Sequence, residues 1–149
     1  MTIGRRLANW RALAWRDRRQ LALYTLGLAL VHAGLALTGY RNTRRTIEAL
    51  SQCANRRPAD HTDLEAARRF ARLVAIAGRH GAVKASCLRQ SLFVYGWLRR
   101  SGLEPRLQLG VKPSDGPFQA HAWVELAGER LLADDAGFQT FHAPFADTF

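Results

Sequence analysis

The sequence has only two cysteines in its 149 residues, Cys53 and Cys87, and they lie in very different segments. A secreted disulfide framework needs an even set of spaced cysteines, and a structural zinc site needs paired ones. Neither pattern is present. We therefore expect a cytoplasmic chain without a structural metal, and no motif indicates a cofactor.

Acidic residues are also scarce, since 12 Asp and Glu stand against 22 Lys and Arg, for a net charge of +10. Most of this excess lies in residues 1–57, which hold 11 arginines and only two acids. Such a region suits a membrane surface, an acidic partner or nucleic acid. Lysine supplies only two of the 22 cations, so a composition bias could explain part of the arginine. No nucleic-acid-binding signature is present, and we expect no nucleic-acid partner.

The N-terminal part contains the longest apolar stretch. Residues 5–19 have the pattern of an amphipathic basic helix. The stretch from Leu21 to Tyr40 has three polar interruptions and is long enough to span a bilayer. It could equally be the core helix of a small helical subdomain, and arginines on both flanks give no orientation. No secretory cleavage site follows it. Membrane association through residues 5–40 is therefore the alternative to a purely cytoplasmic location.

Two more helices are predicted before the second cysteine. One runs from Thr43 to Ala54 and is followed by a break that contains Pro58. The next opens at Asp60 or Thr62 and continues to about His80, with apolar residues at helical spacing. We therefore divide the chain into a basic helical region with one long apolar helix, residues 1–60, and a core, residues 61–149.

A further helix is predicted to begin with Cys87. Ser86 is a natural N-cap and Gly102 a natural C′ residue, so the helix should end near Ser101. Its apolar middle predicts a helix that is buried all round. A cysteine in the first helical turn lies where free N–H groups and the positive end of the helix dipole favour a thiolate. The alternative is a small buried hydrophobic residue, as most free cysteines are.

After Gly102 the apolar period changes from about 3.6 to 2, which predicts antiparallel strands and an α+β fold. The predicted strands are Arg106–Lys112, Phe118–Leu126 and Arg130–Asp135. Turns separate them at residues 113–117 and 127–129. The tail from residue 136 onward is expected to pack as irregular structure or as a short strand.

The middle strand carries His121 on one face, beside Trp123. With a two-residue loop at Gly128 and Glu129, Trp123 would lie opposite Asp134, and His121 would be a diagonal neighbour of Asp134 on the same face. A register change of one residue would place Asp135 there instead. We expect Asp134 to be the partner.

A cysteine, a histidine and a carboxylate are the parts that cysteine acyl transfer requires. The histidine generates the thiolate and later protonates the leaving amine, while the carboxylate orients the histidine. The oxyanion hole would use the backbone N–H of Cys87 and a second donor that the sequence leaves open. Gln90 is the candidate nearest in sequence.

With these residues in view, the chain resembles the transglutaminase-like leader peptidases of lasso peptide biosynthesis. The resemblance spans about residues 65–137 and is carried by residues 86–92, 98–107, 110–111 and 118–125. It implies a transglutaminase- or papain-like cysteine protease core with a buried nucleophile helix and an antiparallel sheet. It also implies a cysteine protease that removes the leader of a ribosomally made precursor, so that a separate ATP-dependent cyclase can close a macrolactam ring. Carried over, Cys87 is the nucleophile, His121 the base and Asp134 the third member.

Fused members of that family carry an N-terminal domain that binds the leader as an added edge strand. Residues 1–80 are predicted to be helical and offer no such edge. We therefore expect the split, protease-only form, which needs a small leader-binding partner protein. Two other functions remain open: a different transglutaminase-like acyl transferase or amidase, and a non-catalytic, membrane-associated peptide-binding adaptor.

Overall fold

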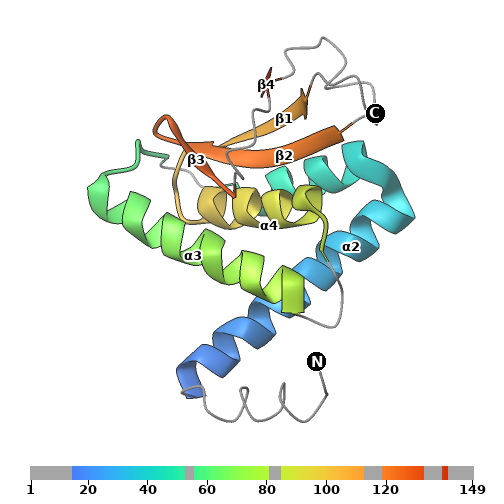
Figure 1. The fold of residues 1–149 in the computed structure, drawn as a ribbon, viewed down its shortest axis with the longest axis horizontal. Helices are drawn as coiled ribbons and strands as arrows, with labels where there is room; N and C mark the ends of the chain where they lie inside the picture. Colours follow the sequence, from blue (N-terminus) through green and yellow to red (C-terminus); the bar gives the residue numbers. More distant parts are fainter. Residues whose placement is uncertain (1–14, 53–55, 81–84, 113–118, 133–138, 141–149) are drawn as a thin grey trace.

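Three helices precede an antiparallel sheet in the computed structural model, which describes residues 15–52, 56–80, 85–112, 119–132 and 139–140. The helices are α2 (Trp15–Leu50), α3 (His61–His80) and α4 (Cys87–Arg100). The strands are β1 (Arg106–Lys112), β2 (Gln119–Leu126), β3 (Glu129–Leu131) and β4 (Gln139–Thr140). Helix α4 lies between the sheet on one side and α2 and α3 on the other (Figure 1). The predicted α+β class is confirmed.

Helix α2 changes direction at Gly39, where φ is 75° and ψ is 177°. Glycine adopts a positive φ without the steric penalty that other residues meet. The hydroxyl of Thr43 donates to the carbonyl of Gly39 at 2.7 Å and so holds the bend. The two helices predicted between Leu21 and Ala54 are therefore the two arms of one bent element. The second arm ends at Leu50, and Cys53 lies outside the described residues.

The first arm of α2 has two different apolar faces. Tyr24, Leu28 and Val31 are buried in the protein. A second row is open, with exposed fractions between 55% and 84%: Leu23, Leu26, Leu30 and Leu37. The segment Arg19–Leu50 is long and apolar enough to cross a membrane, a test that a core helix also passes. The first arm of α2 therefore belongs to the core on one face, and its other face is exposed to solvent.

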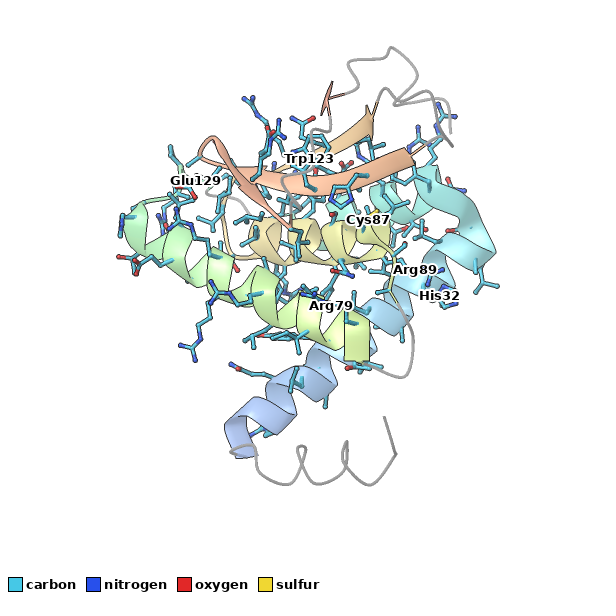
Figure 2. All side chains as sticks on the ribbon, in the orientation of Figure 1. His32, Arg79, Cys87, Arg89, Trp123 and Glu129 are labelled. Carbon is cyan, nitrogen blue, oxygen red and sulfur yellow. The ribbon has the colours of Figure 1, made fainter. Side chains whose placement is uncertain are left out.

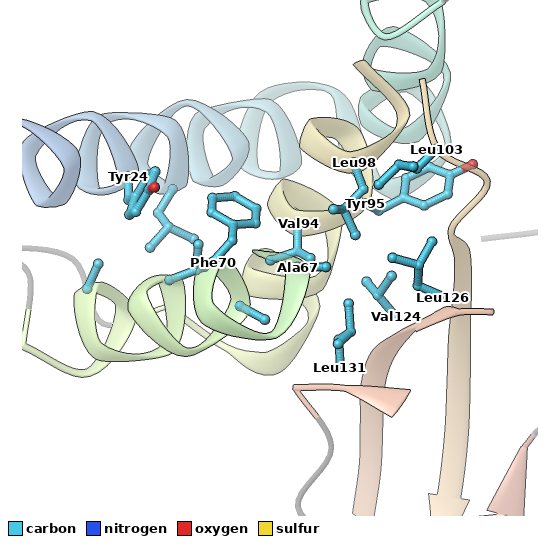
Figure 3. Packing of buried hydrophobic residues seen from close by; sticks show 14 residues of the cluster. Tyr24, Ala67, Phe70, Val94, Tyr95, Leu98, Leu103, Val124, Leu126 and Leu131 are labelled. Atoms are coloured by element: carbon cyan, nitrogen blue, oxygen red, sulfur yellow. The ribbon is translucent and has the colours of Figure 1, made fainter. Parts of the chain in front are cut away.

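Helix α4 packs against α2 and α3 through a cluster of aromatic rings. The rings of Tyr24, Phe70, Phe93 and Trp97 form one cluster, with centroids 5.1 to 6.3 Å apart. Figure 3 shows Tyr24 and Phe70 between α2 and α3, and their rings meet edge to face, with planes 77° apart. The side chain of Trp97 is 44% exposed, so α4 is not buried all round as predicted. Its outer edge reaches the surface because α2 and α3 cover only part of it.

The second arm of α2 is joined to α4 by polar contacts. Tyr95 donates to the carboxylate of Glu48 at 3.0 Å, and Arg44 donates to the same carboxylate oxygen at 3.0 Å. Burial opposes the ionisation of Glu48, but these two hydrogen bonds and the charges of Arg44 and Arg99 together outweigh it and hold the pKa of this carboxyl below its usual range. Arg99 donates to Ser51 at 3.1 Å and lies over the ring of Tyr95. An ionised acid therefore anchors the two helices to each other.

Both ends of α4 lie where the sequence predicts them. The helix begins at Cys87 and Ser86 occupies the N-cap position, although its hydroxyl makes no capping hydrogen bond. Gly102 has a φ of 80°, and the N–H of Leu103 donates to the carbonyl of Leu98 at 3.1 Å. This is the Schellman arrangement that a glycine at C′ favours.

The sheet has the strand order β3-β2-β1-β4, and every neighbouring pair is antiparallel. Val124, Leu126 and Leu131 face the helices and join the core with Val94, Tyr95 and Leu98 of α4 (Figure 3). The short strand β4 fulfils the expectation for part of the tail.

The turn between β2 and β3 differs from the prediction. Leu126 pairs with Glu129, so the loop consists of Ala127 and Gly128, with φ values of 48° and 83°. Two positive φ values define a type I′ turn, which matches the twist of the flanking strands. The predicted Gly128-Glu129 loop is therefore wrong, because Ala127 accepts the left-handed conformation. The pairing shifts by two residues, and Trp123 is no longer opposite Asp134.

The close approach of α4 and α2 predicts that Gly96→Ala destabilises the fold. A Cβ at Gly96 would lie 2.6 Å from Cγ2 of Ile47. Overpacking of this kind costs about 1–3 kcal/mol, which exceeds the roughly 1 kcal/mol that alanine gains over glycine in a helix. Urea denaturation of both proteins measures the difference. In an Ile47→Ala background the same substitution should cost nothing, and equal costs in both backgrounds would contradict the packing.

Candidate functional site

Cys87 is a partly buried free thiol in the first turn of α4. The segment before it is fastened to the end of α3, since the N–H of Ala85 donates to the carbonyl of Gly78 at 3.0 Å. The side-chain amide of Gln90 donates to the carbonyl of Ala85 at 2.8 Å. A Cβ at Gly78 would lie 2.8 Å from the Gln90 amide nitrogen, so the glycine makes room for this contact. The position of the sulfur therefore depends on α3 as well as on α4.

His121 lies on β2 and is partly buried. Its Nε2 is 3.3 Å from the carbonyl oxygen of Leu132, the residue that follows β3. Its ring stacks beside that of Trp123, with centroids 6.2 Å apart and planes 19° from parallel. The indole N–H of Trp123 in turn donates to Glu125 at 3.1 Å. The imidazole is therefore held by the backbone on one side and by an anchored aromatic ring on the other.

A buried hydrogen bond joins the cysteine helix to the histidine strand. Ser91 lies one helical turn after Cys87 and is completely buried. Its hydroxyl donates to the carbonyl of Ala122, the neighbour of His121, at 2.9 Å. This bond sets the distance between the two elements that carry Cys87 and His121. The sequence signal for this bond is a serine among the apolar residues of α4, a pattern that identifies no chemistry by itself.

Cys87 and His121 line the same pocket of about 380 Å³. One wall comes from α3, and the opposite wall comes from β3 and Leu132. In Figure 2, Cys87 lies at the start of α4 beneath β2, and Arg79 lies on α3. The remaining lining residues are Arg68, Ala71, Arg72, Ala75, Gln90, Arg130 and Leu131. The structure thus brings the predicted cysteine and histidine to one cavity.

Asp134 and Asp135 lie outside the described residues, and so does Cys53. Strand β3 ends at Leu131, and Leu132 has a φ of 64°. The strand register therefore does not extend to the two acids, and the choice between them stays a prediction. In the part of the chain that the structure describes, no group of three or more His, Cys, Asp or Glu could hold a metal ion.

Gln90 lines the pocket, but one of its amide hydrogens is already used on Ala85. Each amide nitrogen carries two hydrogens, so one donor remains for an oxyanion. The backbone N–H of Cys87 lies in the first turn of α4, where N–H groups have no partner within the helix.

Cys87 at the start of α4 and His121 on β2 line one cavity. A cysteine and a histidine are two of the three groups that cysteine acyl transfer requires. The family model described as the transglutaminase-like superfamily matches residues 27–145, which is most of the chain. The chain belongs to this superfamily, whose members are typically cysteine hydrolases or transferases. Neither the curated proteins nor the solved structures give a match. The match begins within α2, inside the region that we assigned to residues 1–60, and the predicted boundary at residue 60 stays a prediction.

The buried hydroxyl of Ser91 predicts an effect on both stability and the position of Cys87. Ser91→Ala leaves the carbonyl of Ala122 without this donor, and an unsatisfied buried group costs about 1–3 kcal/mol. We expect a lower urea midpoint and an altered rate of Cys87 alkylation by iodoacetamide under native conditions.

Ser101→Ala is the matched control, since Ser101 lies just after the same helix and its hydroxyl bonds the carbonyl of Trp97 at an exposed site. It should change neither measurement. If Ser91→Ala behaves like Ser101→Ala, the hydrogen bond does not position the two elements.

Proposed function

We propose that this chain is a cysteine peptidase that removes the leader peptide from a ribosomally made lasso peptide precursor. Cys87 is the nucleophile, His121 the general base and Asp134 the third member. The observation that carries the proposal is the shared pocket of Cys87 and His121 in a chain of the transglutaminase-like superfamily. The choice of a lasso precursor as substrate is supported by the sequence resemblance over residues 65–137.

The proposed reaction begins when His121 takes the proton of the Cys87 thiol. A proton on Nε2 that points to the carbonyl of Leu132 leaves the lone pair on Nδ1, so Nδ1 receives the thiol proton. The thiolate attacks the scissile carbonyl, and the N–H of Cys87 stabilises the oxyanion. His121 then protonates the departing amine, and a thioester remains.

Water completes the reaction by attacking the thioester, with His121 again as the base, and the leader leaves as a carboxylic acid. Asp134, the third member of the proposed triad, would orient the imidazole and stabilise its charged form. Another amine in place of water would give transfer, which is the reaction of a transglutaminase-like acyl transferase. Hydrolysis is the reaction that leader removal requires.

The proposal includes partners. Ordering a flexible peptide costs about 1–2 kcal/mol per residue. Contacts near the scissile bond alone offset only a small part of this cost. A separate small leader-binding protein would raise the local concentration of the precursor at Cys87. The described part of residues 1–80 contains two helices and one isolated bridge, Arg57 to Leu103, but no strand whose edge could take the leader. The ATP-dependent lasso cyclase would then take the released core peptide.

The proposed chemistry predicts that Cys87→Ala and Cys87→Ser abolish cleavage of the precursor encoded beside this chain's gene. Mass spectrometry of the products, with the leader-binding partner present, measures the loss. Asp134→Asn should lose far more activity than Asp135→Asn, because one of the two acids orients His121.

Cys53→Ala is the control for loss of a thiol and should cleave at nearly the normal rate. Circular dichroism shows whether each variant is folded. Full activity in a folded Cys87→Ala protein would refute the mechanism, and products joined to an added amine in place of free acids would favour the acyl-transferase alternative.

The open row of leucines on α2 supports a location at a membrane surface. Leu23, Leu26, Leu30 and Leu37 recur at helical spacing and point away from the core. Exposed arginines at either end of this row, Arg19 and Arg41, suit anionic headgroups. The row lies on a helix whose other face is in the core, so the helix would lie in the interface and would not span the bilayer.

This location predicts that the folded protein floats with vesicles that contain phosphatidylserine and does so less with neutral vesicles. Substituting Leu23, Leu26 and Leu30 by glutamine should release the protein while the urea midpoint changes little, because more than half of each of these residues is exposed. Substituting buried Leu28 is the opposite control, since it should unfold the protein. A wild-type protein that never floats would instead assign α2 to the core alone.

A further inference from the structure

Arginines dominate the charged lining of the pocket that contains Cys87 and His121. Arg68, Arg72 and Arg79 line it from α3, and Arg130 lines it from β3. No Asp or Glu is among the described residues of the lining. The cavity beside the cysteine is therefore lined by four guanidinium groups and, among the described residues, by no carboxylate.

The α3 arginines form one row on that helix. Their spacings of four and seven residues place them on a single face, with Ala71 and Ala75 between them. The alanines are short, so they keep the space between the guanidinium groups open. This repeated pattern lies within the segment 68–79 and distinguishes this row from arginines scattered by composition.

Two of the four guanidinium groups are held in place. Arg68 makes a two-pronged ion pair with Glu129, in which Nε donates at 2.9 Å. Arg130 lies over the ring of Trp123, 4.9 Å from its centroid, with Glu125 at 3.8 Å. These contacts fix the β3 side of the pocket and partly neutralise it.

The other two arginines make no ion pair with any residue that the structure describes. Among the described residues, Arg79 donates only to the carbonyl of Ala75, at 3.4 Å, and Arg72 has no acidic partner. Arg79 lies in the last turn of α3, close to Gly78, which contacts the segment before Cys87. No carboxylate of the described residues occupies these two guanidinium groups, which line the pocket from α3.

We propose that Arg72 and Arg79 bind an acidic side chain of the peptide substrate beside the scissile bond. Guanidinium groups match carboxylates through paired, charge-assisted hydrogen bonds, which gives both affinity and orientation. The inference deepens the proposed function by naming the chemistry of the substrate, and its cleavage part rests on that function. Its binding part is independent, because the recognition needs no reaction at Cys87.

The experiment uses the full-length precursor encoded beside this chain's gene and variants in which each Asp or Glu is changed, one at a time, to the matching amide. Binding of the fluorescein-labelled peptides to the Cys87→Ala protein is measured by anisotropy, and cleavage is measured with wild-type protein. We expect one acidic position whose change weakens binding and raises KM by roughly 5- to 20-fold, with kcat little altered.

The double variant Arg72→Gln, Arg79→Gln should weaken binding of the unchanged precursor by a similar factor. It should also no longer distinguish that precursor from the amide variant. Arg69→Gln is the matched control, because Arg69 is exposed on the same helix but does not line the pocket, and it should behave as wild type.

The outcomes separate the two proposals. Cleavage that depends on Cys87 but is indifferent to every acidic position overturns the arginine assignment and leaves the peptidase intact. Selective binding of the acidic peptide, lost in the double variant but without cleavage, supports the assignment and overturns the peptidase. Equal losses in Arg69→Gln and the double variant would mean that general charge attraction, and not this wall, holds the peptide.

Discussion

The position of α4 between two layers is the constraint on which the rest of the structure depends. One side of this helix packs on α2 and α3 through aromatic rings, and the other side packs on the sheet through Val94 and Leu98. Its first turn presents Cys87, and the hydroxyl of Ser91 bonds the strand that carries His121. Because apolar packing resists sliding and the hydrogen bond is directional, the helix can be displaced only by breaking both.

Local signals were enough to predict the parts that depend on few residues. The start of α4 at Cys87 and its end before Gly102 follow from a cap position and a glycine, and the structure has both. The change of the apolar period from about 3.6 to 2 after residue 102 predicted the strands. The hairpin between β2 and β3 was wrong by two residues, because Ala127 adopts a positive φ that alanine seldom takes and that no sequence rule favours there.

Other features need the tertiary arrangement and were beyond reach. The hydrogen bond between Ser91 and Ala122 joins residues 31 positions apart. The arginine row can be recognised as part of a pocket only once α3 is known to line the cavity that contains Cys87. The two faces of α2 could not be separated either, since Tyr24 and Leu26 are both apolar and only the position of α3 and α4 decides which is covered. Cys87 and His121 were predictable because their chemistry singles them out, whatever surrounds them.

The walls of the cavity come from different elements, and this bears on how the protein could change over time. The exposed arginine row lies on α3, whereas Cys87 lies on α4 and His121 lies on β2. The residues that would meet a ligand on that row lie on a different element from the cysteine and the histidine, and they contribute little to the core. Under the proposal for Arg72 and Arg79, substitutions at these two positions would alter ligand preference while Cys87, His121 and the fold stay unchanged.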